Sequence, residues 1–132
     1  MGLTDDERKA IVAYRLEKAT EAIRQVKGVL PLEYWEIIAN RLYYAAFYAV
    51  SALLVNDGYE AHTHNGIIQL FGLHYIKPGK VSLDDGKLYS KLFSLRLTRD
   101  YSDNYTLTKD DVLPLVAPTE QFITAISSLM TE

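Results

Sequence analysis

The chain has 132 residues, with 17 acidic side chains against 14 lysines and arginines, a formal net charge of −3 and no cysteine. This balance argues against general nucleic-acid binding, which draws on a surplus of basic side chains, and leaves room only for a local basic pocket. The absence of cysteine excludes disulfides, thiolate metal sites and a cysteine nucleophile.

The first predicted helix begins at Thr4, because Thr4 and Glu7 have the spacing of a capping box. Gly28 and Pro31 end it. Between these points apolar residues recur at intervals of three and four, which predicts one buried stripe: Val12, Leu16, Ala19, Ile23, Val26 and Leu30.

The second predicted helix covers about residues 32–56 and contains the run 40–55, NRLYYAAFYAVSALLV. This run is apolar or aromatic on nearly every face, so the helix must be enclosed on several sides. About 14 apolar residues are fewer than the ~18–20 that cross a bilayer, so we expect a central bundle helix and no membrane association. No apolar signal core follows the acidic start, which makes the cytoplasm the expected compartment.

Three further helix signals follow along the chain. A short helix is predicted over 63–75, and Ser82 opens another that would bury Leu88, Leu92 and Leu95. A start signal at 108–111 precedes the last helix, which two prolines would kink or delay. No alternating strand pattern of useful length occurs. The predicted fold class is therefore all-α, an up-and-down bundle of four or five helices that forms a single domain over residues 1–132.

The densest polar cluster lies late in the fourth predicted helix. Arg96 stands four residues before Asp100, so the two can meet on one helix face, and Arg99 and Asp103 repeat that spacing. Aspartates near a helix C-terminus oppose the macrodipole, at about 0.3–1 kcal/mol each. A group outside the helix should compensate them, and Arg41 of the central helix is the candidate. Two interpretations stay open: an ion-pair network that joins two helices, or a ligand or RNA pocket.

Histidines and tyrosines offer weaker signals. His62 and His64, two residues apart, make at most half of a metal site, so we expect no metal and interpret them as a solvated loop or helix-cap pair. For His64, packing against the polar cluster of the fourth helix is the alternative. Tyr43, Tyr44 and Tyr48 are interpreted mainly as core or dimer-interface groups, with base stacking as the alternative.

The stretch 40–49, Asn-Arg-Leu-Tyr-Tyr-Ala-Ala-Phe-Tyr-Ala, resembles the second helix of HEPN-domain proteins. The likeness covers about residues 5–130 and includes three shorter stretches: THNG at 63–66, LFG at 70–72, and Leu95-Arg96 leading to Asp100-Tyr101. It implies a small up-and-down helical bundle, usually a homodimer, encoded with a minimal nucleotidyltransferase as a toxin–antitoxin pair. It also implies that active members are metal-independent ribonucleases, without a cofactor, that use an Arg-x(4–6)-His motif late in the bundle.

The motif histidine is absent from this sequence. If Arg96 is the motif arginine, the histidine window holds Tyr101, Ser102 and Asp103, and no histidine follows His74. The pattern resembles a branch of the family that keeps the arginine and has Asp-Tyr in place of the histidine. Histidine is the side chain best suited to proton exchange near neutral pH, so we expect a cleft without an imidazole and favour a protein without nuclease activity.

The leading interpretation is a HEPN-like interaction protein that homodimerises, binds a nucleotidyltransferase and holds a nucleotide or RNA near Arg96. The expected ligand-binding residues are Arg41, Arg96, Arg99, Asp103 and His64. The alternative is a ribonuclease in which the catalytic residues are Arg96, Asp100 and Tyr101, with Arg96 stabilising the pentavalent phosphate. A third reading is a helical-bundle adaptor with no pocket.

Overall fold

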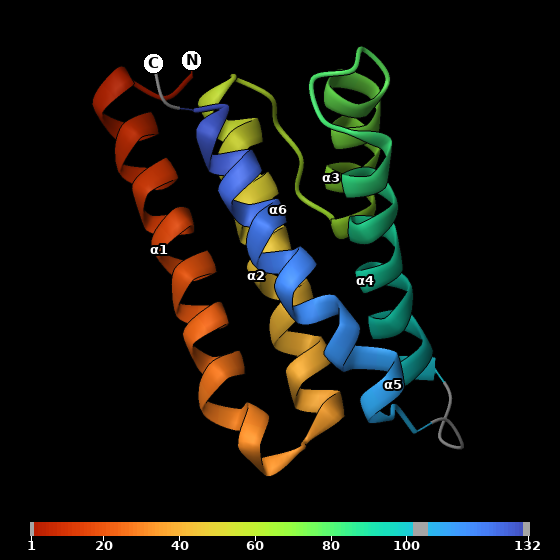
Figure 1. The fold of residues 1–132 in the computed structure, drawn as a ribbon. Coiled ribbons are helices and arrows are strands. Elements are labelled where there is room, and N and C mark those ends of the chain that lie inside the picture. The colour runs from red at the N-terminus through yellow and green to blue at the C-terminus, as the bar shows by residue number, and fades with distance from the viewer. Residues whose placement is uncertain (1, 102–105, 131–132) are drawn as a thin grey trace.

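The computed structural model describes residues 2–101 and 106–130, without the side chains of residues 97–101. No strand occurs among these residues, and the predicted all-α bundle is confirmed. The helices are α1 (Asp5–Val29), α2 (Trp35–Asn56), α3 (His64–Phe71), α4 (Leu83–Tyr101), α5 (Lys109–Val112) and α6 (Val116–Ser128). Figure 1 shows α2 at the centre, with α1 to its left, α3 and α4 to its right and α6 in front of it, and α2 contacts all four.

The predicted helix starts are confirmed by hydrogen bonds. The Thr4 hydroxyl accepts from the backbone N–H of Glu7 at 3.1 Å, and the Glu7 carboxylate accepts from the Thr4 N–H at 2.8 Å. These bonds to Thr4 hold the pKa of Glu7 below its ordinary value. At Ser82 the hydroxyl accepts from the N–H of Asp85, and at Thr108 the N–H donates to the carboxylate three residues ahead. Local capping chemistry therefore sets where α1, α4 and α5 begin.

The connection from α1 to α2 differs from the prediction. A 3-10 turn over Leu30–Leu32 follows α1, and α2 begins at Trp35 rather than near residue 32. Glu33 has φ 59°, a left-handed conformation that a right-handed helix cannot continue through. The second helix therefore starts only after this residue.

The C-terminal helices show the predicted effect of proline. A 3-10 turn over Leu113–Leu115, with Pro114 within it, separates α5 from α6. Proline lacks the N–H that a continuous helix would need at this point. The single kinked helix expected from the sequence is thus two helices with a tight turn between them.

The end of α3 also departs from a regular helix. A π-helical segment over Gly72–Ile76 continues α3 and ends one residue beyond the range predicted for one short helix. Gly86 of α4 faces this segment, and a Cβ built there would lie 2.9 Å from Cδ1 of Ile76. Glycine therefore allows α4 to approach the π segment closely.

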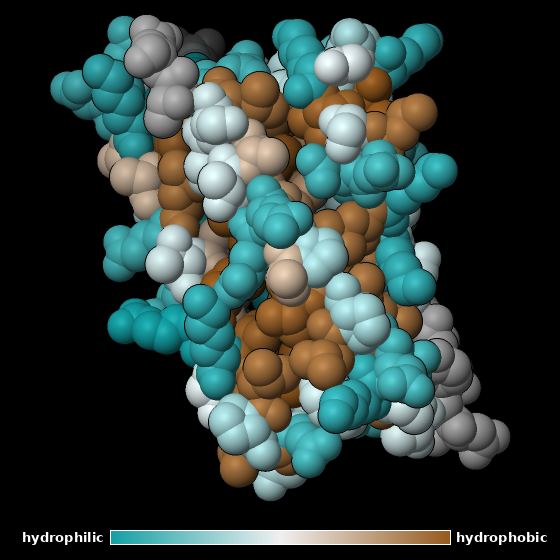
Figure 2. Space-filling view, in the orientation of Figure 1, coloured by the Kyte–Doolittle hydropathy of each residue, from teal (hydrophilic) through white to brown (hydrophobic). Residues whose placement is uncertain are grey.

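The core is organised around α2. Its buried residues are Ile38, Ala39, Leu42, Tyr43, Ala45, Ala46, Ala49, Val50, Ser51, Ala52, Leu53 and Leu54. From α1 the buried residues are small, Ala19, Ala22 and Val26, which lets the two helices pack closely. Of the predicted inward leucines of α4, Leu92 is buried and its two companions are half-buried. Figure 2 shows that apolar side chains also reach the surface on the face where α1 and α6 lie side by side.

The length and hydropathy of α2 alone would allow it to span a bilayer. In the described part of the chain, however, 67% of the relevant window of this helix is buried inside the bundle. This is the environment of a core helix, as its all-round apolar pattern predicts.

Candidate functional site

The N-terminal half of α2 carries aromatic side chains at the boundary between core and surface. Tyr43 is fully buried, whereas Tyr44, Phe47 and Tyr48 are half-buried. The ring centroids of Tyr43 and Tyr44 lie 5.2 Å apart in an edge-to-face arrangement. Two arginines and a histidine join three of these rings in what we term the tyrosine–arginine cluster: Arg41, Tyr43, Tyr44, Phe47, His64 and Arg96.

Arginines from two helices converge on one tyrosine ring of this cluster. Cζ of Arg41, from α2, lies 5.2 Å from the ring centroid of Tyr44, and Cζ of Arg96, from α4, lies 5.9 Å from it. Arg96 is also 5.6 Å from the ring centroid of Tyr43. These distances allow cation–π attraction, which holds each guanidinium against an aromatic face. The cluster thus brings two cations predicted as ligand-binding residues to the same place.

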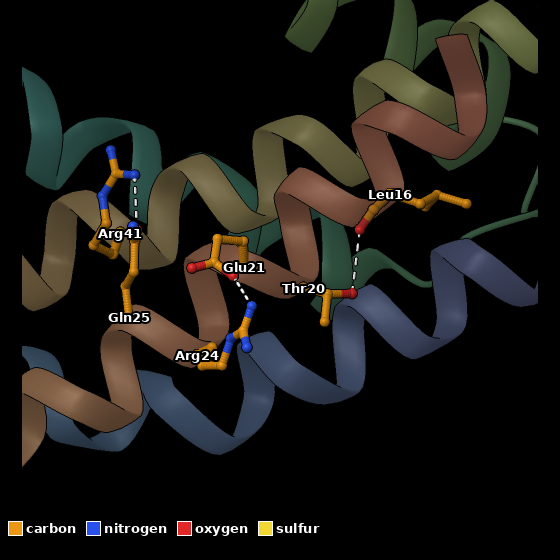
Figure 3. A network of polar contacts seen from close by, with 6 residues as sticks. All are labelled: Leu16, Thr20, Glu21, Arg24, Gln25 and Arg41. Carbon is orange, nitrogen blue, oxygen red and sulfur yellow. Dashed lines mark hydrogen bonds and ion pairs between the residues drawn. The ribbon is translucent and has the colours of Figure 1, made fainter. Parts of the chain in front are cut away.

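Arg41 is further held by hydrogen bonds to uncharged amides. Its Nη1 donates to Oε1 of Gln25, from α1, at 3.2 Å (Figure 3), and its Nε and Nη2 donate to Oδ1 of Asn40 at 3.1 and 2.8 Å. Within the described residues no carboxylate forms an ion pair with Arg41. These amides orient the guanidinium without neutralising its charge.

His64 was interpreted as part of a solvated loop or helix-cap pair, with packing against the polar cluster of the fourth helix as the alternative. The structure places it at the start of α3, with its ring against Tyr43 and Phe47. It is the first residue of α3, and its Nδ1 lies 2.5 Å from the hydroxyl oxygen of Tyr43. Its ring stacks on Phe47, with centroids 4.5 Å apart and planes at 29°. His62, in contrast, is exposed. The expectation of a cleft without an imidazole is therefore wrong: α3 supplies one, although no histidine follows Arg96 in the sequence.

The electrostatics of the cluster favour neutral forms of its tyrosine and histidine. Burial raises the pKa of Tyr43 to about 12, although the charge of Arg96 opposes this rise. Burial lowers the pKa of His64, and Arg96 lowers it further. Arg96 is therefore close enough to act on both groups, and near neutral pH their hydrogen bond joins a phenol to a neutral imidazole.

The other predicted site residues fall outside this description. Asp103 lies outside the described residues, and so do the side chains of Arg99, Asp100 and Tyr101. The predicted Arg96–Asp100 and Arg99–Asp103 pairs, and the compensation of the aspartates by Arg41, therefore remain predictions. Across the described residues, no group of three or more His, Cys, Asp or Glu side chains gathers in a way that could hold a metal ion.

Two aromatic residues of α4 were missed by sequence reasoning. The ring of Tyr89 lies parallel to that of Tyr43, at 6.1 Å, and Phe93 lies 5.8 Å from the same ring. Burial raises the pKa of Tyr89 well above its ordinary value, and Tyr43 adds to that rise. The signal was present, because Tyr89, Phe93 and Arg96 follow the i, i+4, i+7 spacing of a single helix face.

A cavity of about 440 Å³ lies elsewhere, between the α3–π segment and α4. Its lining is mainly apolar and includes Ile68, Phe71, Ile76 and Leu83, together with Lys77 and Lys87. Neither arginine of the tyrosine–arginine cluster lines it. The cavity and the converging charged side chains therefore lie in different parts of the fold. We take the tyrosine–arginine cluster as the candidate site because it gathers two guanidiniums, a histidine and a tyrosine with shifted pKa values.

Known proteins resemble this chain over nearly its whole length. The sequence pattern of the HEPN domain family matches residues 12–129. A UPF0332 protein of Thermotoga maritima is 33% identical over 127 residues, which cover 96% of both chains. A protein of Methanocaldococcus jannaschii named "Putative toxin MJ0605" is 27% identical over 130 residues, or 98% of this chain and 96% of the relative. A UPF0332 protein of Archaeoglobus fulgidus is 29% identical over 109 residues, 83% of this chain and 86% of the relative.

Proposed function

This chain belongs to the HEPN domain family, and on that basis we propose that it is the HEPN component of a toxin–antitoxin-type system. Two relatives from Methanocaldococcus jannaschii carry the word toxin in their names, which supports this role. In this proposal the protein binds a phosphate of RNA or of a nucleotide at the tyrosine–arginine cluster. It acts in the cytoplasm as a single-domain interaction protein.

The observation that carries the binding proposal is the convergence of Arg41 and Arg96 on the ring of Tyr44. Guanidinium groups bind phosphate through charge-assisted and often bidentate hydrogen bonds. The half-buried Tyr44 beside them can contact a nucleobase, as aromatic side chains do in single-strand binding proteins. The negative net charge of the chain limits binding to this local site.

The direct test is the binding of a fluorescently labelled single-stranded RNA, followed by anisotropy, to the wild type and to Arg96→Ala. We expect the substitution to weaken binding at least tenfold. Arg24→Ala is the matched control, because Arg24 is an exposed arginine paired with Glu21 on α1. Equal affinity of all three proteins, or no binding by the wild type, would refute the proposal.

We propose two protein partners as well, a second copy of this chain and a minimal nucleotidyltransferase. Beside the tyrosine–arginine cluster, the half-buried Tyr48 and the 47% exposed Ile37 give α2 apolar surface that a second copy can cover through α2 and α4. A monomeric mass at micromolar concentration would contradict the homodimer. Co-purification with the product of a neighbouring nucleotidyltransferase gene tests the second partner.

A second candidate function is a metal-independent ribonuclease, and the position of His64 favours it. Attack of a ribose 2′-oxygen on phosphorus needs a group that takes the hydroxyl proton and another that protonates the departing 5′-oxygen. Burial and the charge of Arg96 lower the pKa of His64, and a neutral imidazole can take the 2′-hydroxyl proton as a general base. Arg96 would stabilise the pentavalent phosphate, and Asp100 or Tyr101 would supply the second group.

Incubation of the purified protein with total RNA separates the two candidates. Cleavage that is lost in both Arg96→Ala and His64→Ala, and kept in Arg24→Ala, would establish the ribonuclease. Binding of RNA without cleavage at a large excess of protein would leave the interaction protein as the function.

A further inference from the structure

We propose that the hydroxyl of Tyr43 donates its hydrogen to Nδ1 of His64, which fixes the imidazole proton on Nε2 and makes His64 an N–H donor to the bound phosphate. This inference rests on the proposed phosphate site and assigns to His64 a specific positioning role within it. The proton arrangement itself can be tested without any RNA.

Tyr43 and His64 contact each other through their polar atoms. The hydroxyl oxygen and Nδ1 are 2.5 Å apart, which requires a shared hydrogen. A neutral imidazole has one donor and one acceptor nitrogen, so the direction of this bond decides which nitrogen carries the proton. Because Tyr43 is fully buried and keeps its hydroxyl hydrogen at neutral pH, donation to Nδ1 satisfies both groups with one bond.

The imidazole ring of His64 is held in a fixed position by its neighbours. The ring of His64 stacks on Phe47, with centroids 4.5 Å apart, and lies edge to face with Tyr44, with centroids 5.9 Å apart and planes at 83°. Its backbone is set by the cap of α3, where the hydroxyl of Thr63 accepts from the N–H of Gly66 at 2.9 Å. Two aromatic contacts, a hydrogen bond and a capped helix start therefore hold the imidazole in one orientation.

The second ring nitrogen of His64, Nε2, is available for a further hydrogen bond. With Nδ1 engaged by Tyr43, Nε2 has no hydrogen-bond partner among the described residues, and His64 is half-buried rather than enclosed. Arg96 lies close enough for its charge to lower the pKa of His64. An anion drawn to Arg96 would therefore meet an imidazole N–H whose proton cannot move to Nδ1 while Tyr43 occupies that nitrogen.

Nitrogen-detected NMR of the ring tests the proton arrangement directly. In the wild type we expect Nε2 to be protonated and Nδ1 to be an unprotonated acceptor. In Tyr43→Phe, which keeps the ring and removes only the hydroxyl, the Nδ1–H form should become populated and the two nitrogen shifts should move toward each other. A proton on Nδ1 in the wild type would mean that His64 donates to Tyr43, and the inference would be lost.

Two substitutions of His64 test the donor role in RNA binding. Glutamine places an N–H donor near the position of Nε2, and asparagine places an acceptor for Tyr43 near Nδ1 without the distal donor. We expect His64→Gln to bind RNA within about threefold of the wild type and His64→Asn to bind about tenfold more weakly or worse, the scale of a hydrogen bond to a charged acceptor. Unchanged melting temperatures would show that both variants fold.

The possible failures can be told apart. If Arg96→Ala loses binding while both His64 variants bind like the wild type, the donor role is wrong and the phosphate site stands. If the wild type binds no RNA, both the proposed function and the donor role of His64 are wrong. The NMR result still decides which nitrogen of His64 carries the proton.

Discussion

The two halves of α2 look alike in hydropathy and differ in what surrounds them. Every residue from 49 to 54 is buried, and the one polar group there, the hydroxyl of Ser51, accepts a hydrogen bond from Nη1 of Arg15 at 2.5 Å. Residues 41–48 instead alternate between buried positions and half-buried ones, which include Arg41 and Tyr44. The C-terminal half therefore stabilises the bundle. Residues 41–48, which we term the half-open end, are partly exposed and can hold arginines against Tyr44 near the surface.

The largest effect on stability should come from the removal of a side chain among the fully buried residues 49–54. Leu53 has 0% of its surface exposed, so Leu53→Ala should leave a cavity and lower the free energy of unfolding by about 2–5 kcal/mol. Leu83→Ala is the control, because Leu83 is 69% exposed and its removal should change stability by only about 0.5 kcal/mol. Urea unfolding measures both, and equal effects would contradict the enclosure of residues 49–54.

A smaller effect should follow from the polar group of the same half. Ser51→Ala removes the acceptor of a half-buried guanidinium, and loss of a hydrogen bond to a charged group should cost about 1–3 kcal/mol. Ser90→Ala, at an exposed serine of α4, should be nearly neutral. If Ser51→Ala unfolds at the same urea concentration as the wild type, water satisfies Arg15 and the bond contributes nothing.

Sequence reasoning found the elements whose causes are local. Thr4 with Glu7, Ser82 with Asp85, and Thr108 each mark a helix start through groups within three residues, so the sequence alone displays the cause. The left-handed Glu33 and the π segment at 72–76 were missed, because the packing of neighbouring helices decides them. Gly28 and Pro31 signal the break after α1, but no side-chain cap marks the start of the next helix at Trp35.

The candidate site was predicted in part. Arg41 and Arg96 were expected to share a neighbourhood, and both lie against Tyr44. His64 was predicted as a ligand-binding residue, with a solvated loop or helix cap as the leading interpretation, but its partner Tyr43, 21 residues away on another helix, was not foreseen. A search confined to residues after Arg96 could not find an imidazole that tertiary structure brings from α3.

The two halves of α2 should also differ in how they make the free energy of unfolding depend on pH, because residues 49–54 contain no titratable group. Burial raises the pKa of Tyr43 to about 12, while tyrosines of the unfolded chain have a pKa of about 10. Between these pH values the unfolded chain releases a proton that the folded chain keeps. The stabilising contribution is therefore complete below about pH 10 and falls as the pH rises toward 12.

Tyr43→Phe should flatten this alkaline loss of stability, measured by urea unfolding at several pH values above 9. The fall will not vanish, because burial also raises the pKa of Tyr75 and of Tyr89. Tyr14→Phe, at a 59% exposed tyrosine of α1, is the control for removal of a hydroxyl. An alkaline slope in Tyr43→Phe that equals that of the wild type would show that Tyr43 ionises as freely in the folded chain as in the unfolded one.

Two arginine substitutions should change stability least but should differ in their effect on RNA binding. Arg41→Ala removes a cation–π contact and bonds to two amides at the half-open end, and Arg24→Ala removes an exposed ion pair on α1, both shown in part in Figure 3. Each should cost only about 1 kcal/mol or less. Their effects on RNA binding should differ, because only Arg41 stands beside Tyr44 and Arg96.

A measurement of RNA affinity against salt concentration resolves this difference. Loss of one phosphate contact lowers the slope of log affinity against log salt by about 0.7 for single strands, so Arg41→Ala should bind more weakly and with a smaller slope. Arg24→Ala should keep the affinity and slope of the wild type. If Arg41→Ala is weaker at every salt concentration with an unchanged slope, Arg41 supports the ring of Tyr44 rather than a phosphate. The half-open end would then recognise bases, with Arg96 as its contact to the backbone.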